Sequence, residues 1–165
     1  MNDELTRTDI EKMKAELEER RLRLMPELIE EVKRTRAFGD LSENFEYKAA
    51  KQAQNRNKSR IRYLERMIAT AKVIEDRSGA EEVGLYDQVE VYLEEDDEVQ
   101  QLQVVTTVRA DTLQGRISKE SPMGRALLGK HVGDRFTVQV SDDYSFTAEV
   151  RSLKKGRDDG SGDVL

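Results

Sequence analysis

Apolar residues recur at helical spacing through the first part of the chain. From Thr8 to about Arg36 they follow one another at steps of three, four and seven, which places them on one face of an α-helix. These positions are Ile10, Met13, Leu17, Leu24, Leu28 and Val32. Arg20 and Arg21 interrupt this stripe, and Pro26 removes a backbone donor. We therefore expect a kink or a local break near these residues rather than two separate helices.

A second helix is predicted from about Glu43 to Ile74. Its seam positions alternate steps of three and four, as in a heptad repeat. They are Tyr47, Ala50, Gln54, Asn57, Ile61, Leu64, Ile68 and Ala71. A chain reversal at residues 37–40 would pair the two stripes antiparallel, which predicts a helical hairpin for residues 1–76. We interpret the polar seam residues Gln54 and Asn57 as fixing the register rather than as catalytic groups.

The second half of the chain changes to a period of two. This alternation predicts strands in the segments YDQVEVYL, VQQLQVVTTV, RFTVQV and YSFTAEVRSL, and a further strand that ends at Ser118. One short helix is expected from Met123 to Leu128. The fold class is therefore α+β, with a small antiparallel sheet and one helix in residues 85–155. Residues 77–84 indicate a linker, and residues 156–165 are expected to be a disordered tail.

Composition narrows the classes of function. The chain has 165 residues, of which 36% are hydrophobic and 38% charged, so only modest cores are possible. It has no cysteine, which excludes disulfides, thiolate metal sites and a cysteine nucleophile. Its one histidine, His131, is expected at the surface. The charged N-terminus does not resemble a signal peptide, and no apolar run is long enough for a membrane span, so we expect a cytoplasmic protein.

The charge is distributed unevenly along the chain. The formal net charge is −6, but residues 48–72 carry eight bases against one acid, a local balance of +7. Residues 77–165 carry 11 bases against 18 acids, a balance of −7. The basic helix is either a surface paired with the acids of the first helix or a track for a nucleic acid strand. Both interpretations stay open at this point.

The segment GDLSENFEY, at residues 39–47, lies where the hairpin is predicted to turn. Its acids Asp40 and Glu43 have two interpretations. They form half of a site for a hard cation such as Mg²⁺, which a second molecule would complete. Alternatively, the D-x-x-E spacing is a capping box at the start of the second helix. Glu46 is interpreted as a surface acid. Basic residues lie on both sides of the acidic tip in the sequence. We call them the basic collar, and they are Lys33, Arg34, Arg36, Lys48 and Lys51.

Ser121, Pro122 and Met123 precede and begin the predicted short helix. A serine followed by proline is ordinary capping geometry, with Pro122 at the first helical position. An exposed Met123 would also suit contact with a partner. Ala126, Leu127 and Leu128 are expected in the core.

Two long motifs resemble a known family. GDLSENFEYKAAK before a basic helix, and ISKESPMGRALLGKHVGD later in the chain, are similar to the bacterial GreA/GreB transcript cleavage factors. The resemblance covers about residues 5–154. It implies a coiled-coil hairpin followed by an FKBP-like domain, which docks at the rim of the secondary channel of RNA polymerase while the hairpin enters the channel. The modest basic patch favours the GreA type.

The resemblance also implies roles for individual residues. Asp40 and Glu43 would help to hold the second catalytic Mg²⁺ and its attacking water, while aspartates of the polymerase hold the first metal. Arg36 and Lys51 match basic positions that contact the extruded 3′ segment of the nascent RNA. Ser121, Pro122 and Met123 lie in the polymerase-docking loop. The protein would be a monomer that stimulates the polymerase and has no active site of its own.

This sequence departs from the family pattern at two places. Phe45 stands where the family motif usually has alanine, and the stretch QNRNKSR after the AAK segment also differs. Two other functions fit the predicted fold. A regulator of the same shape would occupy the channel and inhibit RNA synthesis, and a coiled-coil scaffold or chaperone would use the rod as a tether.

Overall fold

The structure is a computed structural model that describes residues 3–39 and 44–165. The chain divides into two compact units. One unit consists of Met1–Asp3 with Ile10–Lys72, and the other of Glu4–Asp9 with Val73–Leu165. We describe each unit by itself.

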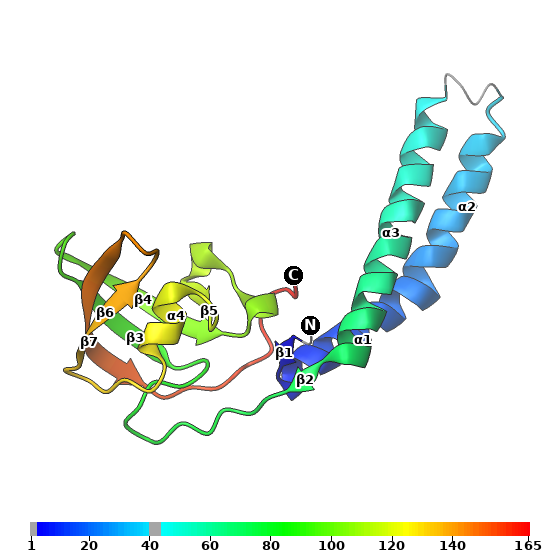
Figure 1. Ribbon diagram of the computed structural model, residues 1–165. Helices are drawn as coiled ribbons and strands as arrows, with labels where there is room; N and C mark the ends of the chain where they lie inside the picture. Colours follow the sequence, from blue (N-terminus) through cyan, green and yellow to red (C-terminus); the bar gives the residue numbers. More distant parts are fainter. Residues whose placement is uncertain (1–2, 40–43) are drawn as a thin grey trace. The chain divides into compact units, whose positions relative to one another are not determined.

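The first unit is a helical hairpin. Helix α1, Arg7–Glu19, belongs to this unit from Ile10 onward, and it continues through a π-helical segment, η1, Arg20–Leu24, into α2, Met25–Arg36. The returning helix α3, Phe45–Thr70, has 26 residues and is therefore about 39 Å long. Helices α2 and α3 lie side by side (Figure 1). The hairpin predicted from the two apolar stripes is confirmed.

The predicted irregularity of the first helix is the π-helical segment η1. The N–H of Met25 donates to the carbonyl of Arg20, five residues back, and the backbone stays helical at Glu19 and Met25. Pro26, in the first turn of α2, has no N–H to donate to the preceding turn. One wider turn accommodates this loss, so the chain remains one continuous helical path.

The seam between the helices is apolar with two buried amides. Its buried apolar side chains are Met13, Leu17, Val32, Ala50, Leu64 and Met67. Asn57 is buried beside Arg20: its Oδ1 accepts a hydrogen bond from Arg20 Nη1 at 2.9 Å, and its Nδ2 donates to the Arg20 carbonyl at 3.3 Å. These bonds join one residue pair across the hairpin, which supports the interpretation that Asn57 fixes the register.

The second helix ends earlier than predicted. It stops at Thr70, and Ala71 is extended, with φ −62° and ψ 138°. Lys72–Val73 then form strand β2, which pairs with β1, Glu4–Leu5. The amide of Lys72 donates to the Asp3 carbonyl and that of Ile74 to the Leu5 carbonyl, both at 2.8 Å. Strand pairing therefore replaces the last predicted helical turn.

The second unit contains a five-stranded sheet. The strands are β3 Gln88–Leu93, β4 Glu98–Val105, β5 Arg116–Ser118, β6 Arg135–Gln139 and β7 Ser145–Lys154. Their order is β5-β4-β3-β7-β6. The pairs β3–β4, β3–β7 and β6–β7 are antiparallel.

The prediction of an all-antiparallel sheet is wrong at one edge, because β5 pairs parallel to β4. The chain between them makes two short 3₁₀ turns, Thr107–Arg109 and Thr112–Gln114, and then Gly115 adopts a left-handed conformation with φ 73°. This crossover brings β5 alongside β4 in the same direction. The sheet is therefore mixed.

The core of this unit lies between the sheet and helix α4, Pro122–Leu127. Alternate residues of β3 are buried, namely Val89, Val91 and Leu93. Leu127 is fully buried, and Ala126 and Leu128 pack against the same core half-buried, as expected from the sequence. His131 is exposed, which was also expected.

A charged cluster that was not predicted is buried in the second unit. Arg109 Nη1 lies 3.2 Å from Asp9 Oδ1 and 2.7 Å from Asp158 Oδ2, and Thr106 donates to Asp9 at 2.7 Å. Arg109 also donates to the Ser161 carbonyl at 2.5 Å. Residues 156–165 were predicted to be a disordered tail, but here Asp158 and Ser161 bond to Arg109. The tail has few apolar groups, but its Asp158 carboxylate neutralises the buried Arg109.

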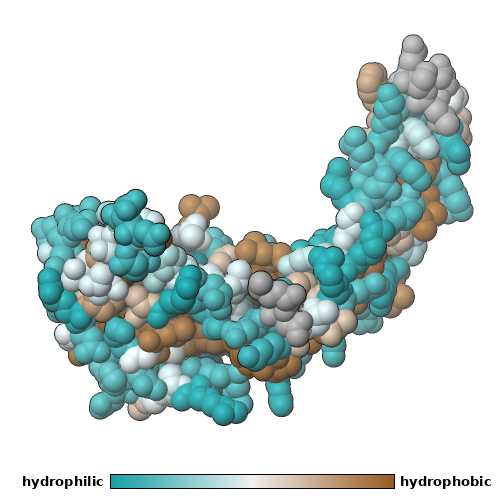
Figure 2. Space-filling model, in the orientation of Figure 1, coloured by the Kyte–Doolittle hydropathy of each residue, from teal (hydrophilic) through white to brown (hydrophobic). Residues whose placement is uncertain are grey.

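Figure 2 shows how polar most of the visible surface is. Hydrophilic residues cover most of the hairpin, with a narrower apolar band along it. This agrees with the 38% charged composition, because a two-helix rod can bury only one stripe of each helix. Within the described ranges, no helix has the length and apolarity to cross a membrane.

Candidate functional site

The two helices of the hairpin are joined at the Thr35 carbonyl, near the turn. This oxygen accepts the N–H of Phe38 at 3.1 Å and Nδ2 of Asn44 at 2.6 Å. Thr35 is itself buried, and its hydroxyl donates to the Glu31 carbonyl at 2.9 Å. The last turn of α2 and the residue before α3 therefore share one anchoring point.

Asn44 is also the N-cap of α3. Its Oδ1 accepts from the Tyr47 amide at 3.0 Å while its Nδ2 holds Thr35. Asparagine is a preferred N-cap residue, so its place directly before a helical pattern could have revealed this role. The capping-box interpretation required Asp40 at the N-cap of this helix, and it is wrong because Asn44 occupies that position. Asp40 and Glu43 themselves lie outside the described residues.

Part of the basic collar is paired with acids of the hairpin. Arg34 Nη2 lies 2.6 Å from Glu31 and 4.0 Å from Glu46, and Lys33 lies 3.8 Å from Glu30. The hydrogen bond from Arg34 lowers the pKa of the Glu31 carboxyl and raises that of Arg34. These contacts match the interpretation of a salt-bridged surface.

The rest of the collar faces solvent. Arg36, Lys48 and Lys51 are exposed, and none of them forms an ion pair with a residue in the described parts of the chain. Lys51 makes only a long hydrogen bond, of 3.4 Å, to Gln54. Three cations near the turn are thus available to an anionic partner.

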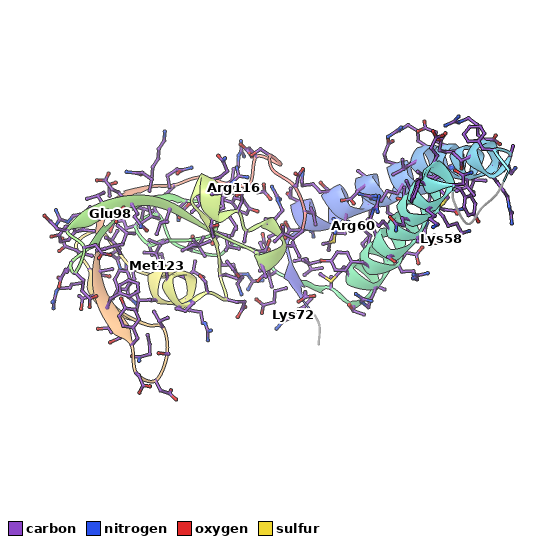
Figure 3. All side chains as sticks on the ribbon, turned by 90° about the horizontal axis from the view of Figure 1, so that it is seen from above. Lys58, Arg60, Lys72, Glu98, Arg116 and Met123 are labelled. Atoms are coloured by element: carbon purple, nitrogen blue, oxygen red, sulfur yellow. The ribbon has the colours of Figure 1, made fainter. Side chains whose placement is uncertain are left out.

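Farther along α3, the bases divide between two faces. Arg60 reaches Glu16 of α1 at 2.7 Å, and Arg20 reaches the same carboxylate at 2.7 Å. Lys58 is exposed, and Figure 3 shows Lys58 and Arg60 on different sides of α3. The interpretation of a paired surface therefore holds for the bases that face helix α1, whereas Lys58 faces solvent.

Two aromatic side chains flank the turn. Phe38 is 55% exposed and Phe45 is 78% exposed. The guanidinium of Arg34 lies 5.3 Å from the centre of the Phe38 ring, and Lys48 Nζ lies 5.6 Å from that of Phe45. The end of the hairpin thus carries exposed rings with a cation near each.

The predicted docking loop has the expected capping geometry. Ser121 is the N-cap of α4; its Oγ accepts from the Gly124 amide at 3.0 Å and donates to the Ser118 carbonyl at 2.6 Å. Pro122 opens the helix. Met123, labelled in Figure 3, is half-buried and packs against the core, so only part of its side chain is available to a partner.

Comparison with known proteins identifies both parts of the chain. Residues 4–73 match the family model of the N-terminal domain of transcription elongation factors, and residues 78–155 match that of the GreA/GreB C-terminal domain. The chain belongs to the GreA/GreB family. The family resemblance found in the sequence is thereby confirmed.

Named relatives of this GreA/GreB protein cover most of its length. The transcription elongation factor GreA of Thermotoga neapolitana is 42% identical over 136 residues, which are 82% of this chain and 87% of the relative. GreA of Staphylococcus saprophyticus is 35% identical over 150 residues, 91% of this chain and 95% of the relative. A solved structure of the GreA factor homolog 1 (Gfh1) of Thermus thermophilus is 30% identical, with a TM-score of 0.42 over 94% of this chain and all of that chain.

Within the GreA/GreB family match, the candidate residues fall in two separate parts. Arg36, Asn44 and Lys51 lie in the segment that matches the N-terminal domain, and Ser121–Met123 in the segment that matches the C-terminal domain. Among residues 3–39 and 44–165, no group of three or more His, Cys, Asp or Glu could hold a metal ion. The two acids proposed to hold Mg²⁺ are outside those residues.

Proposed function

We propose that this elongation factor binds RNA polymerase, inserts its hairpin into the secondary channel and stimulates the polymerase's own Mg²⁺-dependent cleavage of backtracked RNA. It acts as a monomer without an independent active site. One observation carries the proposal: the acidic segment between Gly39 and Asn44 connects two long paired helices whose ends are joined at the Thr35 carbonyl. A stiff stalk with acids at its turn is suited to delivering carboxylates into a partner.

The donor chemistry of the two acids fits the metal. Mg²⁺ prefers a few carboxylate oxygens and keeps several waters, so Asp40 and Glu43 would supply part of a coordination shell that the polymerase completes. When bound, Mg²⁺ stabilises the charge that develops at phosphorus and lowers the pKa of a bound water. The task of this chain is to hold two carboxylates at the end of the hairpin.

The exposed cations have a consistent role in this proposal. Arg36 and Lys51 would contact phosphates of the extruded RNA 3′ segment, since neither is ion-paired to a described residue. In the second unit, the loop Ser121–Met123 would dock on the polymerase. Its capped backbone holds the start of α4 in one conformation, which favours a preformed contact.

Transcript cleavage by stalled, backtracked elongation complexes tests the proposal. Asp40→Asn and Glu43→Gln are each expected to lower the cleavage rate by at least about 100-fold, because loss of a ligand weakens transition-state stabilisation. Binding to the polymerase should persist. Glu46→Gln is the matched control, because it removes a nearby exposed acid and should leave the rate within about twofold.

Other outcomes would decide between the remaining functions. Unchanged cleavage in both tip variants would refute the metal role of the acids. If saturating wild-type factor slows RNA synthesis and does not stimulate cleavage, the protein is a channel-occupying inhibitor. If the tip variants are fully active while Leu64→Asp abolishes activity, the hairpin acts as a scaffold.

A further inference from the structure

We propose that Phe38 and Phe45 form a stacking site for bases of the extruded RNA 3′ segment. This inference rests on the proposed function, because it places the end of the hairpin beside that RNA. The two rings would contact RNA bases. In the proposed function, Asp40 and Glu43 bind the metal, and the basic collar contacts RNA phosphates.

The exposure of these rings is not explained by packing. Phe45 is 78% exposed and Phe38 55%, and neither belongs to the buried seam of the hairpin. Leaving a phenylalanine in water forgoes the hydrophobic stabilisation that burial would give. Phe45 is also the first residue of α3, where a small residue would allow the helix to form equally well. The fold therefore does not require an aromatic side chain at this position.

The backbone brings both rings to the same end of the hairpin. The Phe38 amide and the Asn44 side chain bind the same oxygen, the Thr35 carbonyl, at 3.1 and 2.6 Å. Phe45 follows Asn44 directly in the chain. The cap of α3 and the last turn of α2 therefore fix the backbone from which each ring extends, so less ordering is needed when a ligand binds.

Charge favours RNA over an apolar protein surface as the occupant. Each ring has a cation within 6 Å of its centre: Arg34, which is also paired with Glu31, lies 5.3 Å from Phe38, and Lys48 lies 5.6 Å from Phe45. Lys48 forms no ion pair with any residue in the part of the chain that is described. Sites for single-stranded nucleic acids combine aromatic rings, on which bases stack, with cations that hold the backbone. Burying these cations against an apolar surface would instead require desolvating them.

Phe45 supplies the more exposed of the two rings. Alanine at this position would fit the first turn of α3 but could not stack on a base. We therefore expect this factor to hold backtracked RNA more tightly than its Phe45→Ala variant, and to tolerate different bases, because every base offers an aromatic face.

Substitutions at Phe45 separate stacking from general apolar contact. The measurement is the factor concentration that gives half-maximal cleavage in backtracked complexes. Phe45→Ala and Phe45→Leu should both raise it by about 5- to 100-fold, as expected for loss of one stacked base. Phe45→Trp should keep the wild-type value. Leu22→Ala removes another exposed apolar side chain of the hairpin and is the control, with no change expected.

A photocrosslink reports the contact directly. Complexes are prepared with 5-iodouridine in the extruded 3′ segment and irradiated with full-length factor. Wild type and Phe45→Trp should crosslink to the RNA, whereas Phe45→Ala and Phe45→Leu should lose most of the product. Phe38→Ala should reduce it as well. No crosslink should form in complexes that are not backtracked.

The outcomes distinguish this inference from the proposed function. Asp40→Asn should abolish cleavage but keep the crosslink, which would separate stacking from metal binding. If Phe45→Leu retains wild-type affinity, the ring contacts an apolar surface of the polymerase and the stacking proposal is overturned. It is also overturned if Phe45→Ala changes neither affinity nor crosslinking while cleavage still depends on Asp40 and Glu43. Cleavage that is independent of those acids would overturn the proposed function instead.

Discussion

The two units of the molecule bury polar groups in different ways. In the hairpin, the buried polar groups include the neutral amides of Gln54 and Asn57, and ion pairs such as Arg60–Glu16 remain about one-quarter exposed. In the second unit, Arg109 and Asp9 have side chains that are 1% and 0% exposed. A full ion pair is thus removed from water in the second unit, whereas the ion pairs among the described residues of the hairpin stay partly exposed.

This difference suggests different responses to mutation. Exposed ion pairs contribute little, typically about 0–1 kcal/mol, so the surface of the hairpin can change its charges at small cost in stability. A buried charge that loses its partner costs much more, because it cannot be solvated. The hairpin can therefore present charged groups to a partner, while the second unit depends on a charge cluster in its interior.

The largest effect is expected from Arg109→Leu. This change leaves the fully buried Asp9 and the nearly buried Asp158 without their common cation, and should lower the free energy of unfolding by about 3–5 kcal/mol. Arg135→Leu is the matched control, because Arg135 pairs with Glu94 at 2.5 and 2.8 Å but is exposed. It should cost less than about 1 kcal/mol. Equal losses in urea denaturation would show that burial does not make the Arg109 ion pair more costly to break than an exposed one.

A smaller effect is expected from Asn57→Ala in the hairpin seam. It removes two hydrogen bonds to Arg20, whose carbonyl and guanidinium then lose a partner, and should cost about 1–2 kcal/mol. Asn55→Ala, on the exposed face of α3, should be close to neutral. The two variants are compared by thermal unfolding followed by circular dichroism at 222 nm. A neutral Asn57→Ala would show that the two hydrogen bonds to Arg20 do not stabilise the hairpin.

The smallest effect depends on pH. The hydrogen bond from Arg60 lowers the pKa of the Glu16 carboxyl below its ordinary value of 4.5, more than burial raises it. Folding thus favours the ionised Glu16 carboxylate. The stability that this ion pair contributes is fully present above pH 4.5 and is lost as the pH falls through the lowered pKa. Glu16→Gln should cost about 1 kcal/mol at pH 7 and progressively less below pH 4.5.

Glu18→Gln serves as its control, since Glu18 is exposed on the same helix. The comparison is made by urea denaturation at several pH values. A difference between wild type and Glu16→Gln that stays constant from pH 7 to pH 3 would contradict the assigned ion pair.

Periodicity was sufficient to predict the elements that bury one face. The hairpin seam follows from apolar steps of three and four, because each helix buries one face. Strands β3, β4, β6 and β7 follow from steps of two, because each buries alternate residues. The π-helical turn was foreseen as an irregularity from Arg20, Arg21 and Pro26. These features are local, so the sequence around them was enough.

Features that depend on distant partners were missed. Strands β1 and β2 have two residues each, too few to show a period. The Arg109 cluster joins residues 100 and 49 positions apart, and no local pattern indicates such a contact. The parallel pairing of β5 depends on the crossover through Gly115. The role of Asn44 as N-cap of α3 was missed because the nearby acids Asp40 and Glu43 already offered a capping pattern.

The central claim is that the hairpin supplies metal ligands to another protein's active site. The most direct test is the rate of transcript cleavage in backtracked complexes as a function of Mg²⁺ concentration, with saturating factor. Wild-type factor should lower the Mg²⁺ concentration for half-maximal cleavage, and Glu43→Gln should return it to the value without factor. Coincident Mg²⁺ curves for wild type and Glu43→Gln would contradict the account.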